Sequence, residues 1–197
     1  MSKNLKYEVC KDVLPEEHWQ YLHDFISHAG FSWTYTGGTS HGLEGCMLDD
    51  DTPQLVRSFF HREQVTTTTT TQTPNYFNEI IYTHEYLQAL PQIMMIPQKL
   101  LPNNKPLRVK ANLLQPYPNA PEHHPWHIDS SNSNVSMVYY INDSDGDTFL
   151  GETDTQRVTP KANTAIIFPS NLRHASSNPT KERRMIINYM VEADDTY

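Results

Sequence analysis

The first part of the chain has the apolar spacing of one amphipathic helix between two short strands. Apolar side chains recur at helical intervals at Trp19, Leu22, Phe25 and Ile26. A proline followed by two glutamates at 15–17 suits a first helical turn, and Gly30 suits the position after the last turn. We therefore predict a helix over residues 15–29, a short strand within 6–14 and another within 31–35.

The middle of the chain is less regular. Alternating side chains predict a strand over 77–82. Residues 85–101 have helical spacing, but the prolines among them predict two short helical pieces rather than one helix. Six threonines at 66–71 favour a solvated loop or an edge strand, and a flap over an active site is the alternative. We expect the segments 36–55 and 61–76 to be the loops that select a substrate.

From residue 105 onward, short apolar runs alternate with turns at close spacing. Such a pattern is typical of an antiparallel sandwich or jelly roll. We expect a single domain over 1–197, with an N-terminal support over about 1–104 and a β core over about 105–192. The predicted strands of the core cover residues 107–114, 127–130, 135–141, 148–150, 156–159, 164–168, 173–176 and 185–191.

Composition and charge narrow the class of protein. The 197 residues carry 15 basic and 23 acidic side chains, a net charge of −8, which argues against a protein that binds nucleic acid through phosphate contacts. No run of eighteen apolar residues predicts a membrane span, and the N-terminal residues lack the apolar segment of a secretory signal. Cys10 and Cys46 have no metal or redox spacing, so we expect a cytoplasmic protein.

Candidate metal chemistry is concentrated around His127 and Asp129. Two residues that are two positions apart on a strand share one face, so their imidazole and carboxylate form half of a chelate. By themselves they are equally consistent with an ordinary hydrogen-bonded pair. His174 follows 45 residues after Asp129, and Arg184 follows ten residues after His174. Two histidines and one carboxylate make the facial triad of non-haem Fe(II) oxygenases, and arginine is suited to bidentate carboxylate recognition.

With these residues the C-terminal half resembles the 2-oxoglutarate- and Fe(II)-dependent dioxygenases. It is most similar to the prolyl-hydroxylase-like branch, which includes small proteins of phages and marine bacteria. The resemblance implies a double-stranded β-helix (jelly-roll, cupin-like) core in an α+β, mainly β fold, with N-terminal helices packed on it. It covers about residues 105–192 and is carried by residues 108–113, 127–129, 138–142, 163–169, 174 and 183–189.

The resemblance implies that Fe(II) is held by His127, Asp129 and His174. The far carboxylate of the co-substrate, 2-oxoglutarate, would pair with Arg184, which would be the fourth catalytic residue. The adjacent Arg183 is the alternative partner. We favour Arg184 because it shares a strand face with the polar Asn188, whereas Arg183 shares a face with the apolar set Met185, Ile187 and Tyr189.

Two tyrosines are expected to complete the carboxylate pocket. Tyr140 lies on the less bulky face of its predicted strand, and it matches a tyrosine that binds the co-substrate in the hydroxylase branch. Tyr117, ten residues before His127, matches a second one. For Tyr140 the functional role outweighs that of a plain core residue, and for Tyr117 the two roles are evenly balanced.

The family chemistry implies a hydroxylase that uses Fe(II), 2-oxoglutarate and O₂, with ascorbate as a candidate addition, and that releases succinate and CO₂. A peptidyl side chain, proline first, is the favoured substrate, and a small molecule is the alternative. Competing hypotheses are a cupin-type metal enzyme with other chemistry and a binding module without catalysis. The protein would act in the cytoplasm of a bacterium or of a phage-infected host cell. The sequence leaves its oligomeric state open.

Overall fold

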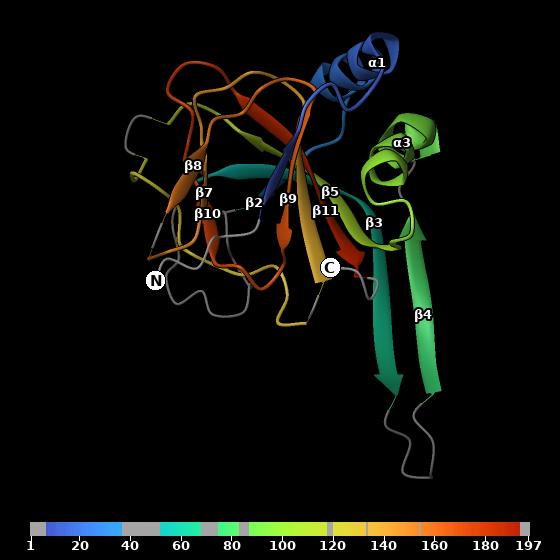
Figure 1. Ribbon diagram of the computed structural model, residues 1–197. Helices are drawn as coiled ribbons and strands as arrows, with labels where there is room; N and C mark the ends of the chain where they lie inside the picture. The colour runs from blue at the N-terminus through green and yellow to red at the C-terminus, as the bar shows by residue number, and fades with distance from the viewer. Residues whose placement is uncertain are drawn as a thin grey trace.

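The strands of the computed structural model form two antiparallel sheets, and two helices cover the outer face of the larger sheet (Figure 1). The structure describes residues 7–36, 52–67, 75–82, 87–117, 120–132, 134–153 and 155–193. The molecule thus has a helical layer, a major sheet and a minor sheet. This confirms the mainly β jelly-roll fold with N-terminal helices packed on it.

The major sheet contains strands from both halves of the chain. Its order is β1 (Glu8–Cys10), β9 (Thr164–Pro169), β6 (Asn134–Tyr140), β11 (Arg184–Glu192), β5 (Pro106–Leu114), β3 (Gln54–Thr67) and β2 (Thr34–Thr36). The N-terminal segment therefore supplies strands to the same sheet as the C-terminal core.

The hairpin of β3 and β4 (Asn75–Tyr82) corrects the expectation of a loop where residues 61–67 and 75–76 form strands. Most of the other expected loop, residues 36–55, lies outside the described residues. Strand β3 begins at Gln54 and pairs with β5 along its first part and with β4 along its second part. Figure 1 shows the hairpin reaching beyond the rest of the sheet. Thr66 and Thr67 belong to β3, and the remaining threonines of the 66–71 run lie outside the described residues.

The minor sheet is short and carries part of the candidate site. Its order is β10 (His174–Ser176), β7 (Thr148–Leu150) and β8 (Gln156–Val158). The predicted strand over 127–130 is not formed; only His127 pairs there, through a single bridge to His174. That bridge adds one more row at the β10 edge of the minor sheet.

Alternation along the strands gives the major sheet two different faces. On β11, Met185, Ile187 and Tyr189 pack in the core beneath the helices, whereas Ile186 packs between the two sheets. The larger core also includes Leu22 of α1. Burial of this apolar area, at roughly 25 cal/mol per Å², is the main stabilising contribution to the fold.

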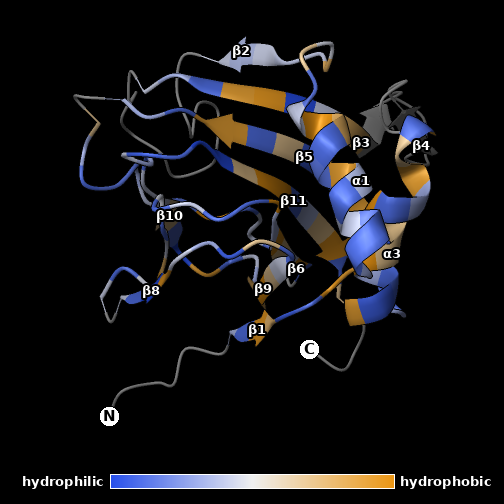
Figure 2. Cartoon of the chain, turned by 90° about the horizontal axis from the view of Figure 1, so that it is seen from above, coloured by the Kyte–Doolittle hydropathy of each residue, from blue (hydrophilic) through white to orange (hydrophobic). Residues whose placement is uncertain are grey.

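Helix α1 (Glu16–Ser27) agrees closely with its prediction. Two glutamates in the first turn favour the positive end of the helix dipole, and Leu22 and Ile26 are its buried residues. The indole Nε1 of Trp19 donates to the carbonyl oxygen of Ile141 at 2.8 Å, which fastens the helix to the sheet. Figure 2 shows hydrophilic and hydrophobic stretches alternating along α1, as in a helix with one buried face.

Helix α3 (Leu90–Leu100) corrects the expectation of a break at Pro97, although a turn at Ala89 does separate it from the helical residues 87–88. Pro91 lies in the first turn, where the missing N–H has no intrahelical partner to lose. Pro97 lies near the other end and is buried, so its contacts offset one missing hydrogen bond. In the described part of the chain, neither helix is long and apolar enough to span a membrane.

Candidate active site

Three side chains that are far apart in sequence meet between the two sheets. The candidate ligand atoms of His127, Asp129 and His174 lie within 4.8 Å of one another. The backbone N–H of His127 donates to the carbonyl oxygen of His174 at 3.0 Å, and the reverse bond measures 2.9 Å. This pairing brings the two imidazole centroids to 4.3 Å. Backbone geometry therefore fixes both rings before any metal binds.

Both imidazoles present the same nitrogen to the centre of the group. The Nδ1 atom of His127 lies 3.2 Å from the carbonyl oxygen of Pro125, and Nδ1 of His174 lies 2.9 Å from that of Leu172. A carbonyl oxygen can only accept a hydrogen bond, so each ring donates from Nδ1 and its Nε2 is the nitrogen that can bind a metal. Such outer hydrogen bonds orient histidines that bind metals.

Asp129 is held by two side chains. Its Oδ1 accepts a hydrogen bond from Nη2 of Arg108 at 2.8 Å, and its Oδ2 accepts one from the hydroxyl of Ser136 at 2.6 Å. Burial by itself would raise the pKa of Asp129, but the charges of His174 and Arg108 and the Ser136 hydroxyl outweigh it. They hold this pKa well below its usual range, so the carboxylate stays ionised and able to bind a cation.

The His127 imidazole is kept neutral. Burial, reinforced by the neighbouring His174, lowers the pKa of His127 to about 4. A neutral imidazole is the form that binds a metal, so no proton has to leave His127 at neutral pH.

The metal-free protein is expected to lose stability as the pH falls from 6.5 to 4. In that range the unfolded chain binds a proton at residue 127 and the folded chain does not, so acid favours unfolding. The free energy of unfolding should fall by about 1.4 kcal/mol per pH unit from this group. Urea denaturation in the presence of a chelator measures it. A His127→Asn variant should show a flatter pH dependence, and an equal slope in both proteins would contradict the assignment.

A second cluster lies deeper between the sheets, around Arg184. Tyr140 Oη and Arg184 Nη2 both donate to Oγ1 of Thr148, each at 2.8 Å. The guanidinium carbon of Arg184 lies 5.8 Å from the centroid of the Tyr140 ring. Burial raises the pKa of Tyr140 to about 12, so its hydroxyl is a neutral donor. Because Thr148 Oγ1 already accepts two bonds, its own hydroxyl hydrogen is left for another acceptor.

This cluster has the properties of a carboxylate pocket. Arg184 is 3% exposed, and its Nε has no hydrogen-bond partner among the residues that the structure describes. A buried and unpartnered N–H of a guanidinium is costly unless an anion binds it. Thr148 lies two residues before Leu150, which pairs with His174. The pocket is therefore about 7 Å along β7 from the group of His127, Asp129 and His174, called the metal group below. A five-carbon dicarboxylate can bridge this spacing.

The structure separates the two arginines that the sequence left as alternatives. Arg184 begins β11 and turns its side chain to the inner face together with Ile186, as strand alternation predicts. Arg183 precedes the strand and is half-buried; its carbonyl oxygen accepts a hydrogen bond from Asn142 Nδ2 at 2.7 Å. Tyr117 is 39% exposed, and within the described part of the chain no hydrogen bond joins it to the Arg184 cluster.

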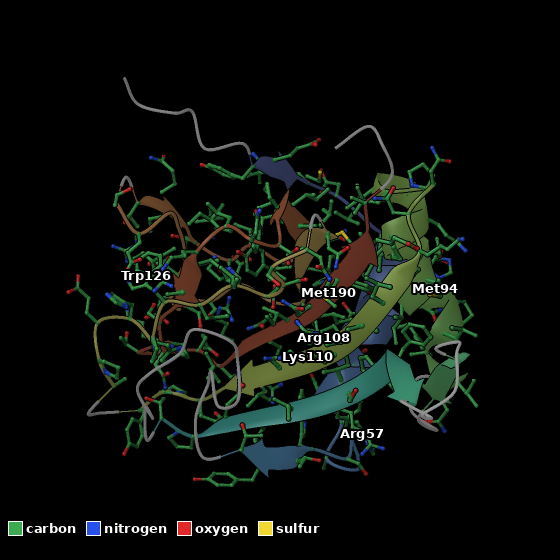
Figure 3. All side chains as sticks on the ribbon, turned by 90° about the horizontal axis from the view of Figure 1, so that it is seen from below. Arg57, Met94, Arg108, Lys110, Trp126 and Met190 are labelled. Atoms are coloured by element: carbon green, nitrogen blue, oxygen red, sulfur yellow. The ribbon has the colours of Figure 1, made fainter. Side chains whose placement is uncertain are left out.

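Several residues of the site were not found by sequence reasoning. Arg108, Ser136 and Thr148 hold the candidate ligands or face the pocket, and Lys110 lies on the same strand face as Arg108 (Figure 3). The alternation of Arg108 and Lys110 with Val109 and Ala111 was the available signal, because it places two cations on one face of a predicted core strand.

The fold and this group of residues define a metal-binding jelly roll whose site resembles that of an oxygenase. Two imidazoles and one ionised carboxylate fit Fe(II) and leave coordination positions open, and the Arg184 pocket fits a carboxylate. Residues 113–191 match the family model of the 2OG-Fe(II) oxygenase superfamily. That segment, less than half of the chain, is similar to this superfamily, and with the His127, Asp129 and His174 group it supports an oxygenase-type enzyme that uses Fe(II) and 2-oxoglutarate.

Solved structures agree on the fold. An oxidoreductase of the 2OG-Fe(II) oxygenase family from Burkholderia pseudomallei is 11% identical with a TM-score of 0.64, covering 94% of this chain and 84% of that one. A Pseudomonas putida prolyl-4-hydroxylase is 15% identical with a TM-score of 0.56, covering 96% and 94%. The epimerase SnoN from nogalamycin biosynthesis is 13% identical with a TM-score of 0.56, covering 94% and 76%. No curated protein matches the chain in sequence.

Proposed function

We propose that this oxygenase hydroxylates an unactivated C–H bond of a peptidyl side chain, with proline as the first candidate. The observation that carries the proposal is the meeting of His127, Asp129 and His174 about 7 Å from the Arg184 pocket. The likeness in fold to a prolyl-4-hydroxylase along nearly the whole chain supports a peptide substrate. The likeness to an epimerase keeps a small molecule as the second candidate.

The roles of the residues follow from their contacts. His127, Asp129 and His174 would hold Fe(II), with Arg108 and Ser136 keeping the carboxylate of Asp129 in one orientation. Ser136 and Arg108 each use one carboxylate oxygen, which favours binding of the metal through a single oxygen. This leaves positions for the co-substrate and O₂.

The carboxylate pocket would orient the co-substrate. Arg184 and Thr148 would bind the far carboxylate of 2-oxoglutarate, and Tyr140 would hold Thr148 in place. When bound, Fe(II) and 2-oxoglutarate supply the chemistry that reduces O₂, yields succinate and CO₂, and inserts one oxygen atom into a C–H bond. The apolar side chains of Val138, Ile166 and Ile186 between the sheets would limit the access of water.

A paired-peptide assay tests the substrate class. We expect the Fe(II)-loaded protein to form succinate faster with proline-containing peptides than with the same peptides in which alanine replaces proline. One product peptide should gain a single oxygen atom derived from O₂, seen by mass spectrometry. Stimulation by small molecules alone would favour the second candidate. If 2-oxoglutarate does not bind to the iron-loaded protein at all, a cupin-type enzyme with other chemistry becomes the better explanation.

A further inference from the structure

Two cationic side chains lie on the inner face of β5 beside the candidate metal ligands. Arg108 pairs in register with Met190 of β11, and Lys110 pairs with Asn188. Side chains two positions apart on a strand share a face, so Arg108 and Lys110 lie on the same side of β5. Val109, which stands between them, faces the other side and packs in the core beneath the helices. Figure 3 shows Arg108 and Lys110 next to each other on β5. The side chains on one side of the metal group are therefore positively charged.

Arg108 and Lys110 differ in their hydrogen-bond and ion-pair partners. Arg108 donates to Asp129 at 2.8 Å and to Asn188 Oδ1 at 3.4 Å. Lys110 makes no hydrogen bond or ion pair with any residue that the structure describes. Lys110 shares the strand face of Arg108, which contacts Asp129, so its side chain lies on the side of the metal group. In agreement, the charge of Lys110 lowers the pKa of His127, and the charge of Asp129 raises the pKa of Lys110. Lys110 is thus a cation at the candidate site without a protein partner among the described residues.

Other polar groups on this face also lack partners. Asn112, the next inward residue of β5, is 6% exposed and its Oδ1 has no hydrogen-bond partner among the described residues. The Nε atom of Arg108 is buried and unpartnered in the same part of the structure. Buried polar groups are nearly always hydrogen-bonded, so these two exceptions on the strand face of Lys110 indicate a ligand that binds there.

The half-buried position of Lys110 has an electrostatic cost. Burial, together with the charge of Arg108, lowers the pKa of Lys110 to about 8, and the charge of Asp129 only partly opposes this. The side chain is therefore still charged at neutral pH, although burial disfavours its charge. Such a cation is stabilised when an anion binds beside it.

The bound co-substrate does not supply that anion. In the proposed enzyme, Asp129 and the two carboxylates of 2-oxoglutarate balance the charges of Fe(II) and Arg184. Asp147, the other buried acid near Arg184, is already paired with Arg157. Among the residues that the structure describes, Arg108 and Lys110 then remain as two excess positive charges beside the metal group. A neutral substrate would leave this excess unbalanced.

We propose that Lys110, assisted by Arg108 and Asn112, binds a carboxylate of the substrate that is oxidised. This inference rests on the proposed function and specifies its substrate class: the oxidised C–H bond belongs to a molecule with a carboxylate near the reacting carbon. The carboxylate belongs to a small acid, to a peptide terminus or to an acidic side chain next to the oxidised residue.

Matched probe pairs test the inference by calorimetry. The protein is loaded with Mn(II) and 2-oxoglutarate, so that it is complete but does not turn over. The pairs are propionate and propionamide, N-acetylproline and N-acetylprolinamide, and an N-acetyl-prolyl-glutamate amide and its glutamine counterpart. We expect at least one acid to bind about ten-fold or more tightly than its amide, since a charge-assisted hydrogen bond contributes this much. The pair with the largest preference identifies the source of the carboxylate.

Variants of Lys110 assign the preference to this residue. Lys110→Gln should reduce the preference to about two-fold or less, and Lys110→Arg should restore part of it. Lys181→Gln, at an exposed lysine, is the matched control and should keep the full preference. Equal binding of acids and amides by the wild-type protein, or an undiminished preference in Lys110→Gln, would overturn the inference.

The same experiment separates failure of the inference from failure of the proposed function. Binding of 2-oxoglutarate to the Mn(II)-loaded wild-type protein is measured first, and its absence would overturn both. Normal 2-oxoglutarate binding by Lys110→Gln shows that this variant is folded. If instead Lys110→Gln weakens 2-oxoglutarate binding by ten-fold or more, Lys110 binds the co-substrate and not the substrate, which also overturns the inference.

Discussion

Replacement of Asp129 by alanine is expected to lower Fe(II) affinity by more than about 100-fold and to abolish 2-oxoglutarate turnover. Removal of an outer hydrogen-bond partner alone costs about 10–100-fold in metal affinity, and Asp129 is the one carboxylate of the candidate triad. The measurement is an anaerobic titration of 2-oxoglutarate into the iron-loaded variant, in which the metal-to-ligand charge-transfer band should be absent.

The same substitution also tests the electrostatics around the site. Without Asp129, the cations Arg108 and Lys110 lose the acid that the structure places beside them. The metal-free variant should be destabilised by about 1–3 kcal/mol in urea. Asp129→Asn keeps an oxygen that accepts from Arg108, so it should lose iron binding with a smaller loss of stability. A charge-transfer band of normal strength in either variant would show that the metal binds elsewhere.

Replacement of Arg184 by methionine is expected to weaken 2-oxoglutarate binding by about 100-fold and to leave Fe(II) binding close to normal. The buried guanidinium would bind the far carboxylate through charge-assisted hydrogen bonds, and methionine fills a similar volume without any donor. The titration that was described for Asp129 should still give the charge-transfer band, but at much higher 2-oxoglutarate concentrations.

Arg183→Met is the matched control for Arg184. It removes a cation at the adjacent position, and its side chain is outside the Thr148 and Tyr140 cluster. We expect its 2-oxoglutarate affinity to stay within about two-fold of wild type, because no hydrogen bond joins Arg183 to Thr148 or Tyr140 in the described part of the chain. If Arg183→Met weakened binding and Arg184→Met did not, the carboxylate partner would be Arg183 and the assignment from strand phase would be wrong.

Local patterns in the sequence predicted most of the strands and the first helix. The buried strands β5, β6, β9 and β11 lie close to their predicted ranges because their apolar runs are flanked by turn residues. The helical spacing of α3 was visible in the sequence, but the effect of Pro97 and the extent of β3 were not. Pro97 is accommodated in α3 by tertiary burial, and the polar strand β3 is formed by pairing with β5 and β4.

The candidate metal ligands could be proposed from the sequence because His127 and Asp129 stand two positions apart, with a histidine and an arginine at family spacing. Their supporting contacts could not. Arg108 and Ser136 reach Asp129 from strands that approach only when β5, β11 and β6 pair in register. The contact of Thr148 with Arg184 could not be predicted for the same reason, since β7 belongs to the other sheet.

The sequence by itself determined the mainly β fold, the candidate metal triad, the face on which Arg184 lies and, with it, the class of enzyme. These depend on spacing within one strand or on residue type, which local order along the chain records. Only the tertiary structure decided which side chains hold Asp129, which hydroxyl faces Arg184, and that Lys110 lies on the side of the metal group without a partner among the described residues. Those facts depend on contacts between segments that are distant in sequence, and no local pattern encodes them.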